Sequence, residues 1–227
     1  MSIVTAIVSA YYAEKFLEGR LLNLLDQRPQ PEIVVVCQEG SPEHLITMTC
    51  KDLVVFTTTG IPTVYGAWNI AIDHATGDYL TNSNCDDRLY PGALAYMASL
   101  LDRDPNARIV YPNVDITPVL DGPPTNRYEW IDGGRAELEA GCFIGPMPMW
   151  RKELHTLYGK FDDKLQVAGD YDFWLRVVTD TSHLIHCKRS VGAYLRRPDS
   201  VEHRLAGLAA WESAKVRSRN SSLRRQK

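Results

Sequence analysis

The chain has 227 residues, of which 44% are apolar and 23% charged, and its formal net charge is −3. This composition is typical of a soluble globular protein of one large domain or two small ones. Its five cysteines, without any C-x-x-C spacing, argue against a disulfide framework and a structural zinc site, and no apolar run approaches the ~20 residues of a membrane span. We therefore expect a cytoplasmic protein without a transmembrane segment.

The first half of the chain alternates apolar runs with helical periods. Residues 3–10 and 32–37 are β-branched and apolar, as in strands buried on both faces of a parallel sheet. The predicted order is strand 3–10, a helix from residue 14 to Arg28-Pro29, strand 32–37, a helix to about residue 49, strand 53–57, helix 64–74, a strand ending at residue 84, a helix opening near Pro91 and stopped by Asp104-Pro105, and strand 108–114. This series predicts an α/β fold with a mostly parallel central sheet flanked by helices.

The second half has weaker signals. Residues 117–134 are rich in proline and glycine, and we interpret them as an active-site loop rather than a domain linker, because the residues beyond are too few for an independent core. Helices are expected at 151–158 and 171–179, a strand at about 184–187, and a terminal helix from about residue 203. The six basic residues between Lys215 and Lys227, with no acid among them, predict a solvated end; an electrostatic contact with lipid, nucleic acid or a partner is the alternative.

The tetrad Asn84-Cys85-Asp86-Asp87 follows the fourth predicted strand. Carboxyl ends of parallel strands share one edge of a sheet, where ligands bind, so the tetrad should lie close to Tyr11 and Glu39. Carboxylates at such an edge can bind a hard divalent cation that bridges two phosphates. Asn and Asp are also common in strand-end turns, because they hydrogen-bond their own backbone. The tetrad alone leaves both interpretations open.

Several ordered segments resemble family-2 glycosyltransferases of the GT-A fold, over nearly the whole chain. Each segment is a weak signal, and their common order and spacing make the resemblance specific. They are Ser9-Ala10-Tyr11-Tyr12, Cys37-Gln38-Glu39-Gly40-Ser41, Gly66-Ala67-Trp68-Asn69, Gly77-Asp78-Tyr79, the tetrad (similar to Asp-x-Asp), Arg151-Lys152-Glu153-Leu154, Gly159-Lys160-Phe161-Asp162 and Gly169-Asp170-Tyr171-Asp172-Phe173-Trp174-Leu175-Arg176.

The resemblance implies transfer of a sugar from a nucleotide-diphosphate donor, with a UDP-sugar favoured, to an acceptor hydroxyl with inversion. It implies a single GT-A-like domain over residues 1–205, with a donor-binding half at 1–115 and an acceptor-side half at 135–205, followed by a helix and basic tail at 206–227. The acceptor stays open between a glycan, a protein, a lipid carrier and a modified nucleobase.

The resemblance also implies roles for individual residues. Asp170 matches the general base of inverting members, although from the residues alone it is equally compatible with a helix N-cap. A divalent cation, Mn²⁺ or Mg²⁺, is the implied cofactor. The donor-binding residues are Ser9, Tyr11, Glu39, Asn69, Asn84 and Asp86, and the metal ligands are Asp86, Asp87 and His203.

Three positions depart from the family pattern: Asn84 replaces the first Asp of Asp-x-Asp, Gln38 and Glu39 replace two aspartates, and Trp68 replaces an arginine. An amide oxygen can ligate a hard cation without contributing charge, so metal affinity or donor preference is expected to differ. Two rival functions stay open: a nucleotidyltransferase, which lacks support because no Gly- and Lys/Arg-rich loop follows the first strand, and a degenerate module that binds nucleotide-sugar or glycan without turnover.

Overall fold

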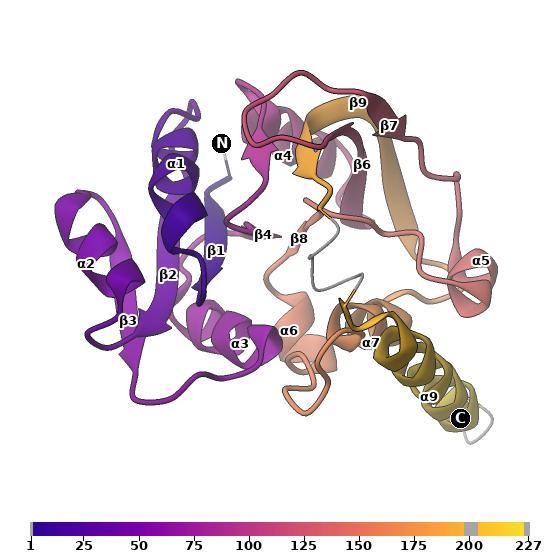
Figure 1. Cartoon of the computed structure of the whole chain (residues 1–227). Helices are drawn as coiled ribbons and strands as arrows, with labels where there is room; N and C mark the ends of the chain where they lie inside the picture. The colour runs from indigo at the N-terminus through magenta and orange to yellow at the C-terminus, as the bar shows by residue number, and fades with distance from the viewer. Residues whose placement is uncertain (1, 198–203, 225–227) are drawn as a thin grey trace.

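The computed structural model describes residues 2–197 and 204–224 of the chain (Figure 1). Its strands are β1 Val4–Ala10, β2 Glu32–Gln38, β3 Val54–Thr58, β4 Tyr79–Asn82, β5 Arg88–Leu89, β6 Ala107–Thr117, β7 Asn126–Tyr128, β8 Met149–Arg151 and β9 His183–Leu195. Its helices are α1 Glu14–Leu25, α2 Pro42–Thr49, α3 Val64–His74, α4 Ala93–Arg103, α5 Arg135–Ala140, α6 Leu154–Tyr158, α7 Gly169–Val177 and α9 Ala206–Arg224.

The strands form one sheet in the order β3-β2-β1-β4-β8-β6-β9-β5, with β7 paired to β6. The first four neighbours are parallel, and β8 joins them in antiparallel orientation to both β4 and β6. This arrangement confirms the predicted α/β fold with a mostly parallel sheet. It also confirms the local reasoning, because the β-branched runs that predicted β1 and β2 are their buried cores.

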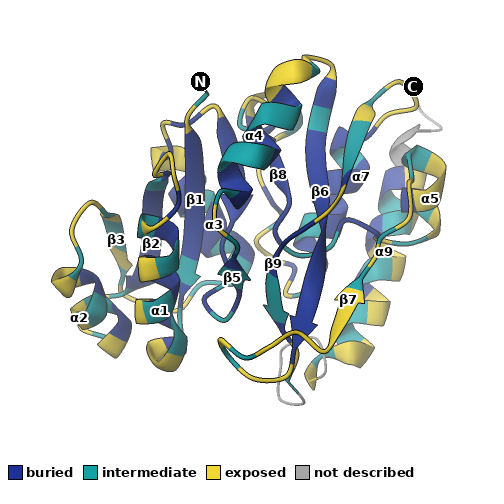
Figure 2. Ribbon diagram, turned by 90° about the horizontal axis from the view of Figure 1, so that it is seen from above, coloured by how far each residue is buried: buried dark blue, intermediate teal, exposed yellow. Residues whose placement is uncertain are grey.

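Helices cover both faces of the sheet, and the central strands are mostly buried (Figure 2). Successive side chains of a strand point to opposite faces, so Ile7 of β1 packs in one apolar cluster while Val8 packs in the other. The first cluster is completed by α3, α6 and α7, and the second by α1 and α4. Among the described residues, no helix has the length and hydropathy that crossing a bilayer requires.

Several predicted boundaries after residue 84 were wrong, because short strands depend on tertiary pairing. The helix predicted to open near Pro91 is α4, which begins at Ala93 after Gly92 in the left-handed region at φ +74°, but Arg88–Leu89 just before it forms an unpredicted strand against β9. The predicted helix 151–158 divides into β8 and α6, since Trp150 pairs with both neighbouring strands. The loop contains β7, and β9 extends well beyond residue 187 along β6.

The prediction of a solvated C-terminal end was also wrong for the described part of that end. Helix α9 packs against α7 (Figure 1), and Val216 contributes to the same apolar cluster as Ile7 and Trp150. Two polar residues of the same helix, Glu212 and Asn220, are buried as well. The division of the chain at residues 115, 135 and 205 remains a prediction.

Candidate active site

All the predicted donor-binding residues except Asn69 lie near the edge of the sheet where β1, β2 and β4 end. Ser9 is near the end of β1, and Glu39 directly follows β2, where its main-chain N–H donates to Thr58 O of β3 at 3.0 Å. A cavity of about 420 Å³ opens there, lined by Tyr11, Phe16, Gln38 and Ile61 among others. The position beyond parallel strand ends is the usual ligand site of an open α/β sheet.

Tyr11 forms one wall of this cavity. Its phenol oxygen lies 2.8 Å from Oγ1 of Thr58, at the end of β3, and burial raises the pKa of the phenol. The hydrogen bond holds the ring beside the strand ends. A fixed aromatic face of this kind is suited to packing against a nucleobase.

Asp86 carries an ion pair in the structure. Its Oδ2 lies 3.0 Å from Nη2 of Arg197, and the two side chains are each 28% exposed. The guanidinium carbon of Arg197 also lies 4.7 Å above the centre of the Phe16 ring. The carboxylate of Asp86 therefore faces a position that already accommodates a cationic group.

Asp87 points the other way and is only 1% exposed. Its carboxylate accepts hydrogen bonds from the side-chain amide of Asn84 at 3.1 Å and from the main-chain N–H of Leu195 at 3.3 Å. Burial, and then the charge of Asp86, raise the pKa of Asp87 to about 7. Asp87 thus supports the tetrad from beneath, and the amide at position 84 supplies a donor where a second carboxylate would repel it.

Arg20 lies behind the tetrad and was missed by the sequence reasoning. It is 0% exposed, and its Nη1 donates to the main-chain oxygen of Asp87 at 3.2 Å. Burial lowers its pKa to about 10, while the charge of Asp87 opposes that shift. The available signal was its spacing on α1, where Arg20 interrupts the buried stripe of Leu17, Leu21 and Leu24.

Asp170 is the second residue of α7, whose N-cap is Ala168, so the N-cap interpretation of Asp170 is wrong. Its carboxylate accepts hydrogen bonds from the hydroxyl of Tyr65 at 3.1 Å and from the main-chain N–H of Tyr171 at 2.8 Å. Burial raises its pKa, and these two donors partly offset the effect. Tyr65 lies in the first turn of α3, the helix that follows β3. Its hydrogen bond therefore places Asp170 near the same edge of the sheet.

The two remaining predicted site residues are Asn69 and His203. Asn69 lies in α3, and its amide binds the main chain of Phe161 in both directions, donating to the oxygen at 2.9 Å and accepting from the N–H at 3.1 Å. His203 lies outside the described residues. Within residues 2–197 and 204–224, no three His, Cys, Asp or Glu side chains gather as ligands for one metal ion.

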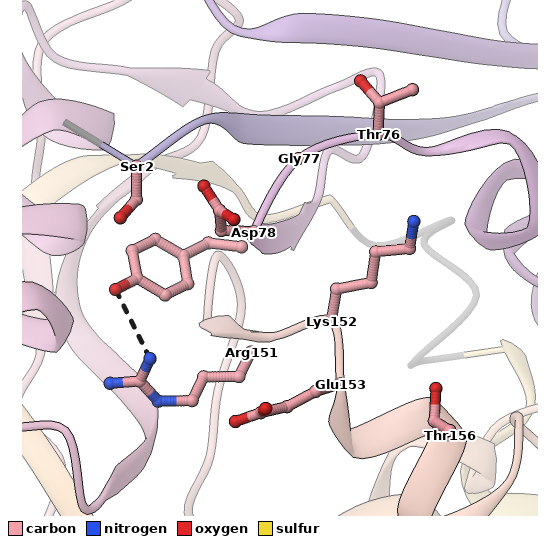
Figure 3. Close-up of a pocket in the computed structure, with 9 residues that line it drawn as sticks. Ser2, Thr76, Gly77, Asp78, Arg151, Lys152, Glu153 and Thr156 are labelled. Carbon is pink, nitrogen blue, oxygen red and sulfur yellow. Dashed lines mark hydrogen bonds between the residues drawn. The ribbon is translucent and has the colours of Figure 1, made fainter.

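A second cavity, of about 470 Å³, lies at the opposite edge of the sheet, where Ser2 precedes β1 and Gly77 and Asp78 precede β4 (Figure 3). One of its charged groups, the guanidinium of Arg151, is engaged in the fold. Arg151 donates to Leu101 O at 2.8 Å, to Asp104 O at 3.1 Å and, more weakly, to the Tyr79 hydroxyl at 3.5 Å. None of the predicted site residues within the described part of the chain lines this cavity.

The family model of Glycosyl transferase family 2 matches residues 5–161. The chondroitin synthase of Pasteurella multocida (strain Pm70) is 24% identical over 182 residues, which cover 77% of this chain and 19% of that protein. The structure of S. aureus TarS 1-349 in complex with UDP aligns with a TM-score of 0.74 at 15% identity, covering 96% of this chain and 65% of that one.

The mannosyltransferase PcManGT from Pyrobaculum calidifontis, in complex with GDP-Man and Mn²⁺, aligns with a TM-score of 0.62 at 19% identity. The alignment covers 85% of this chain and 56% of that one. The chain therefore spans about a fifth of the length of the chondroitin synthase and less than two thirds of these solved structures.

Proposed function

Because the chain belongs to Glycosyl transferase family 2, we propose that it transfers a sugar from a nucleoside diphosphate to an acceptor hydroxyl, with inversion at the anomeric carbon. The observation that carries the proposal is the environment of Asp170, a carboxylate with a raised pKa that is held by Tyr65 beyond the strand ends. A general base needs a pKa nearer to the working pH than that of a solvated carboxylate.

In this proposal the nucleoside occupies the cavity beside Tyr11 and extends to Ser9 and Glu39 at the ends of β1 and β2, while Asn69 contributes through the backbone that it holds. A UDP-sugar is the donor that we expect. Two relatives of similar fold support a nucleotide-sugar, since TarS has been solved with UDP-GlcNAc and PcManGT with GDP-Man. Gln38 replaces a carboxylate in this cavity, so its amide is the group to vary when donor preference is tested.

A divalent cation, Mn²⁺ or Mg²⁺, fits the Asp86 side of the site. The fit rests on the ion pair, because the Asp86 carboxylate faces a cationic group at 3.0 Å. When bound, the cation supplies positive charge to the diphosphate of the donor. We propose Asp86 as its ligand, with Asn84 Oδ1 and His203 as further candidates. The prediction that Asp87 is a ligand is not carried forward, because its carboxylate is enclosed and already hydrogen-bonded.

The proposed chemistry assigns one proton transfer to the protein. Asp170 accepts the proton of the acceptor hydroxyl as that oxygen attacks the anomeric carbon from the face opposite the leaving diphosphate. The Tyr65 hydroxyl favours the charged form of Asp170 and keeps its oxygens oriented. The acceptor, whether a glycan, a protein, a lipid carrier or a modified nucleobase, is left to experiment.

The proposal is tested by incubating the protein with a panel of nucleotide-sugars and a manganese salt. Release of nucleoside diphosphate supports sugar transfer, and release of pyrophosphate would instead indicate a nucleotidyltransferase. Donor binding without turnover would indicate a binding module. Mass spectrometry of the products, with candidate acceptors of each class added in turn, then identifies the acceptor.

A further inference from the structure

The carboxylate of Glu212, on α9, is buried against the backbone that leads into α7. It is 3% exposed and accepts hydrogen bonds from three consecutive main-chain N–H groups. The donors are Gln166 at 3.0 and 3.1 Å to the two oxygens, Val167 at 2.9 Å and Ala168 at 3.0 Å. The three residues immediately before α7 are therefore bound by a side chain 44 residues away from Ala168 in the sequence.

The Glu212 carboxylate supplies a hydrogen-bond acceptor at the start of α7, which the N-cap residue itself lacks. The N-cap, Ala168, has no side chain that can accept a hydrogen bond. Of the three N–H groups that Glu212 binds, only that of Ala168 belongs to the helix start, and those of Gln166 and Val167 precede it. A negative charge at a helix start is favoured by the helix dipole. Glu212 provides both an acceptor and a charge, and bonds between a carboxylate and N–H groups are stronger than neutral ones.

A second contact joins the same two helices one turn further along α7. Asp172, which is 1% exposed, accepts from Nδ2 of Asn220 at 3.0 Å and pairs with Nη2 of Arg219 at 2.6 Å. Arg176 of α7 completes the set at 2.9 Å. A buried carboxylate is stable only with such partners.

The residues that make these contacts lie on one face of α9. Glu212, Val216 and Asn220 are spaced four apart and are 3%, 0% and 6% exposed. Glu212 binds just before Asp170 and Asn220 binds two residues after it. The first turn of α7 is thus fixed on both sides of Asp170 by polar groups with defined geometry.

We propose that α9 positions the candidate base, with Glu212 and Asn220 as positioning residues that set the first turn of α7 and thereby hold Asp170 against Tyr65. The catalytic part of this inference rests on the proposed function. Apolar contacts alone would let α7 slide or rotate, whereas three directional bonds to one carboxylate fix its start. A small displacement of a base can lower the rate by as much as ~10²-fold.

The test compares Glu212→Ala and the closer mimic Glu212→Gln with Lys215→Ala, which changes an exposed residue of the same helix. Transfer is measured well below the melting temperature, together with donor affinity. We expect kcat to fall roughly tenfold or more in Glu212→Ala, with partial rescue in Glu212→Gln, while donor Kd stays within about twofold of the wild type. A lower melting temperature with kcat equal to that of Lys215→Ala would overturn the proposal.

Amide hydrogen exchange separates this inference from the proposed function. Exchange over residues 166–171 should be faster in Glu212→Gln than in Lys215→Ala, whether or not a donor is turned over. That difference, in a protein without transferase activity, would leave the positioning intact and refute only the proposed function. Equal exchange in the two variants would overturn the positioning itself.

Discussion

Oδ2 of Asp86 and Nη2 of Arg197 lie 3.0 Å apart, so the carboxylate proposed to hold a cation is already paired with one. Both side chains are partly exposed, and such a pair contributes about 0–1 kcal/mol. A divalent cation with suitable ligands can displace it. Once displaced from Asp86, Arg197 can bind the diphosphate of the donor or remain packed over the Phe16 ring.

The first prediction concerns this competition. Arg197→Gln removes the competing charge, so Mn²⁺ should bind the donor-free protein up to ~5-fold more tightly than in the wild type. Asp86→Ala should weaken binding of both Mn²⁺ and the donor. Calorimetry with Mn²⁺ alone, and then with donor and a chelator, measures these effects. Unchanged donor affinity in Asp86→Ala and in the presence of chelator would remove the proposed role of the cation.

The second prediction concerns the pH dependence of stability. The pKa of Asp87 is raised to about 7 from an ordinary value of 3.8, so the folded state holds this proton more tightly than the unfolded state. The stabilisation is full below about pH 4 and is lost as the pH rises through about 7. The free energy of unfolding of the wild type should therefore fall between about pH 5 and pH 8. In Asp87→Asn, which has no proton to lose at this position, that fall should be smaller by on the order of 2 kcal/mol. Urea unfolding at the two pH values measures the difference, and parallel behaviour of the two proteins would disprove the assignment.

The third prediction uses Tyr65. Its hydroxyl donates to the Asp170 carboxylate and lowers the pKa of Asp170, so Tyr65→Phe should raise that pKa further. The acid limb of the rate profile should then move to higher pH, because a base must be deprotonated to act. Tyr90→Phe removes a comparable Tyr–Asp hydrogen bond, to Asp115 at 2.7 Å, and is the matched control. If the two variants have the same pH profile as the wild type, Asp170 does not control the rate.

The fourth prediction concerns the end of α9. The solvated end expected from the sequence would allow residues 218–227 to be removed with the fold intact, and the structure argues otherwise. The truncation deletes Arg219 and Asn220, which leaves the buried carboxylate of Asp172 with Arg176 alone among these partners. Leaving a buried charge wholly unpaired costs roughly 3–5 kcal/mol, and because Arg176 remains paired with Asp172 the loss here should be smaller than that. Thermal unfolding should show a clear drop in melting temperature, and a value equal to that of full-length protein would show that these contacts contribute little.

The first half of the fold was predictable because its signals are local. The buried β-branched run of β1 and the proline at the start of α2 specify their elements without help from distant residues. The convergence of Tyr11, Glu39 and the tetrad followed from the parallel order of the strands. The strands β5, β7 and β8 were not predictable, because each has only two or three residues and exists through pairing with a distant strand.

The supporting residues of the site were hidden for the same reason. Arg20 and Glu212 are charged residues on helices, and such residues are usually solvated. Their burial depends on partners that the sequence does not identify: the Asp87 backbone for Arg20, and the three N–H groups before α7 for Glu212. Asp170 was found through a family resemblance, while its partner Tyr65 carries no motif of its own.

Asp170 carries the proposed sugar transfer, and Asp170→Asn is the variant that tests its role most directly. Asn keeps an oxygen that can accept from Tyr65 and Tyr171, so the protein should fold and bind donor with near wild-type affinity. It cannot take a proton, so the rate of sugar transfer should fall by ~10²–10⁴-fold. The decisive measurement is therefore kcat for transfer in Asp170→Asn, alongside calorimetric donor binding in the same preparation. A folded variant that binds donor and transfers sugar at close to the wild-type rate would contradict the assignment of Asp170 as the base.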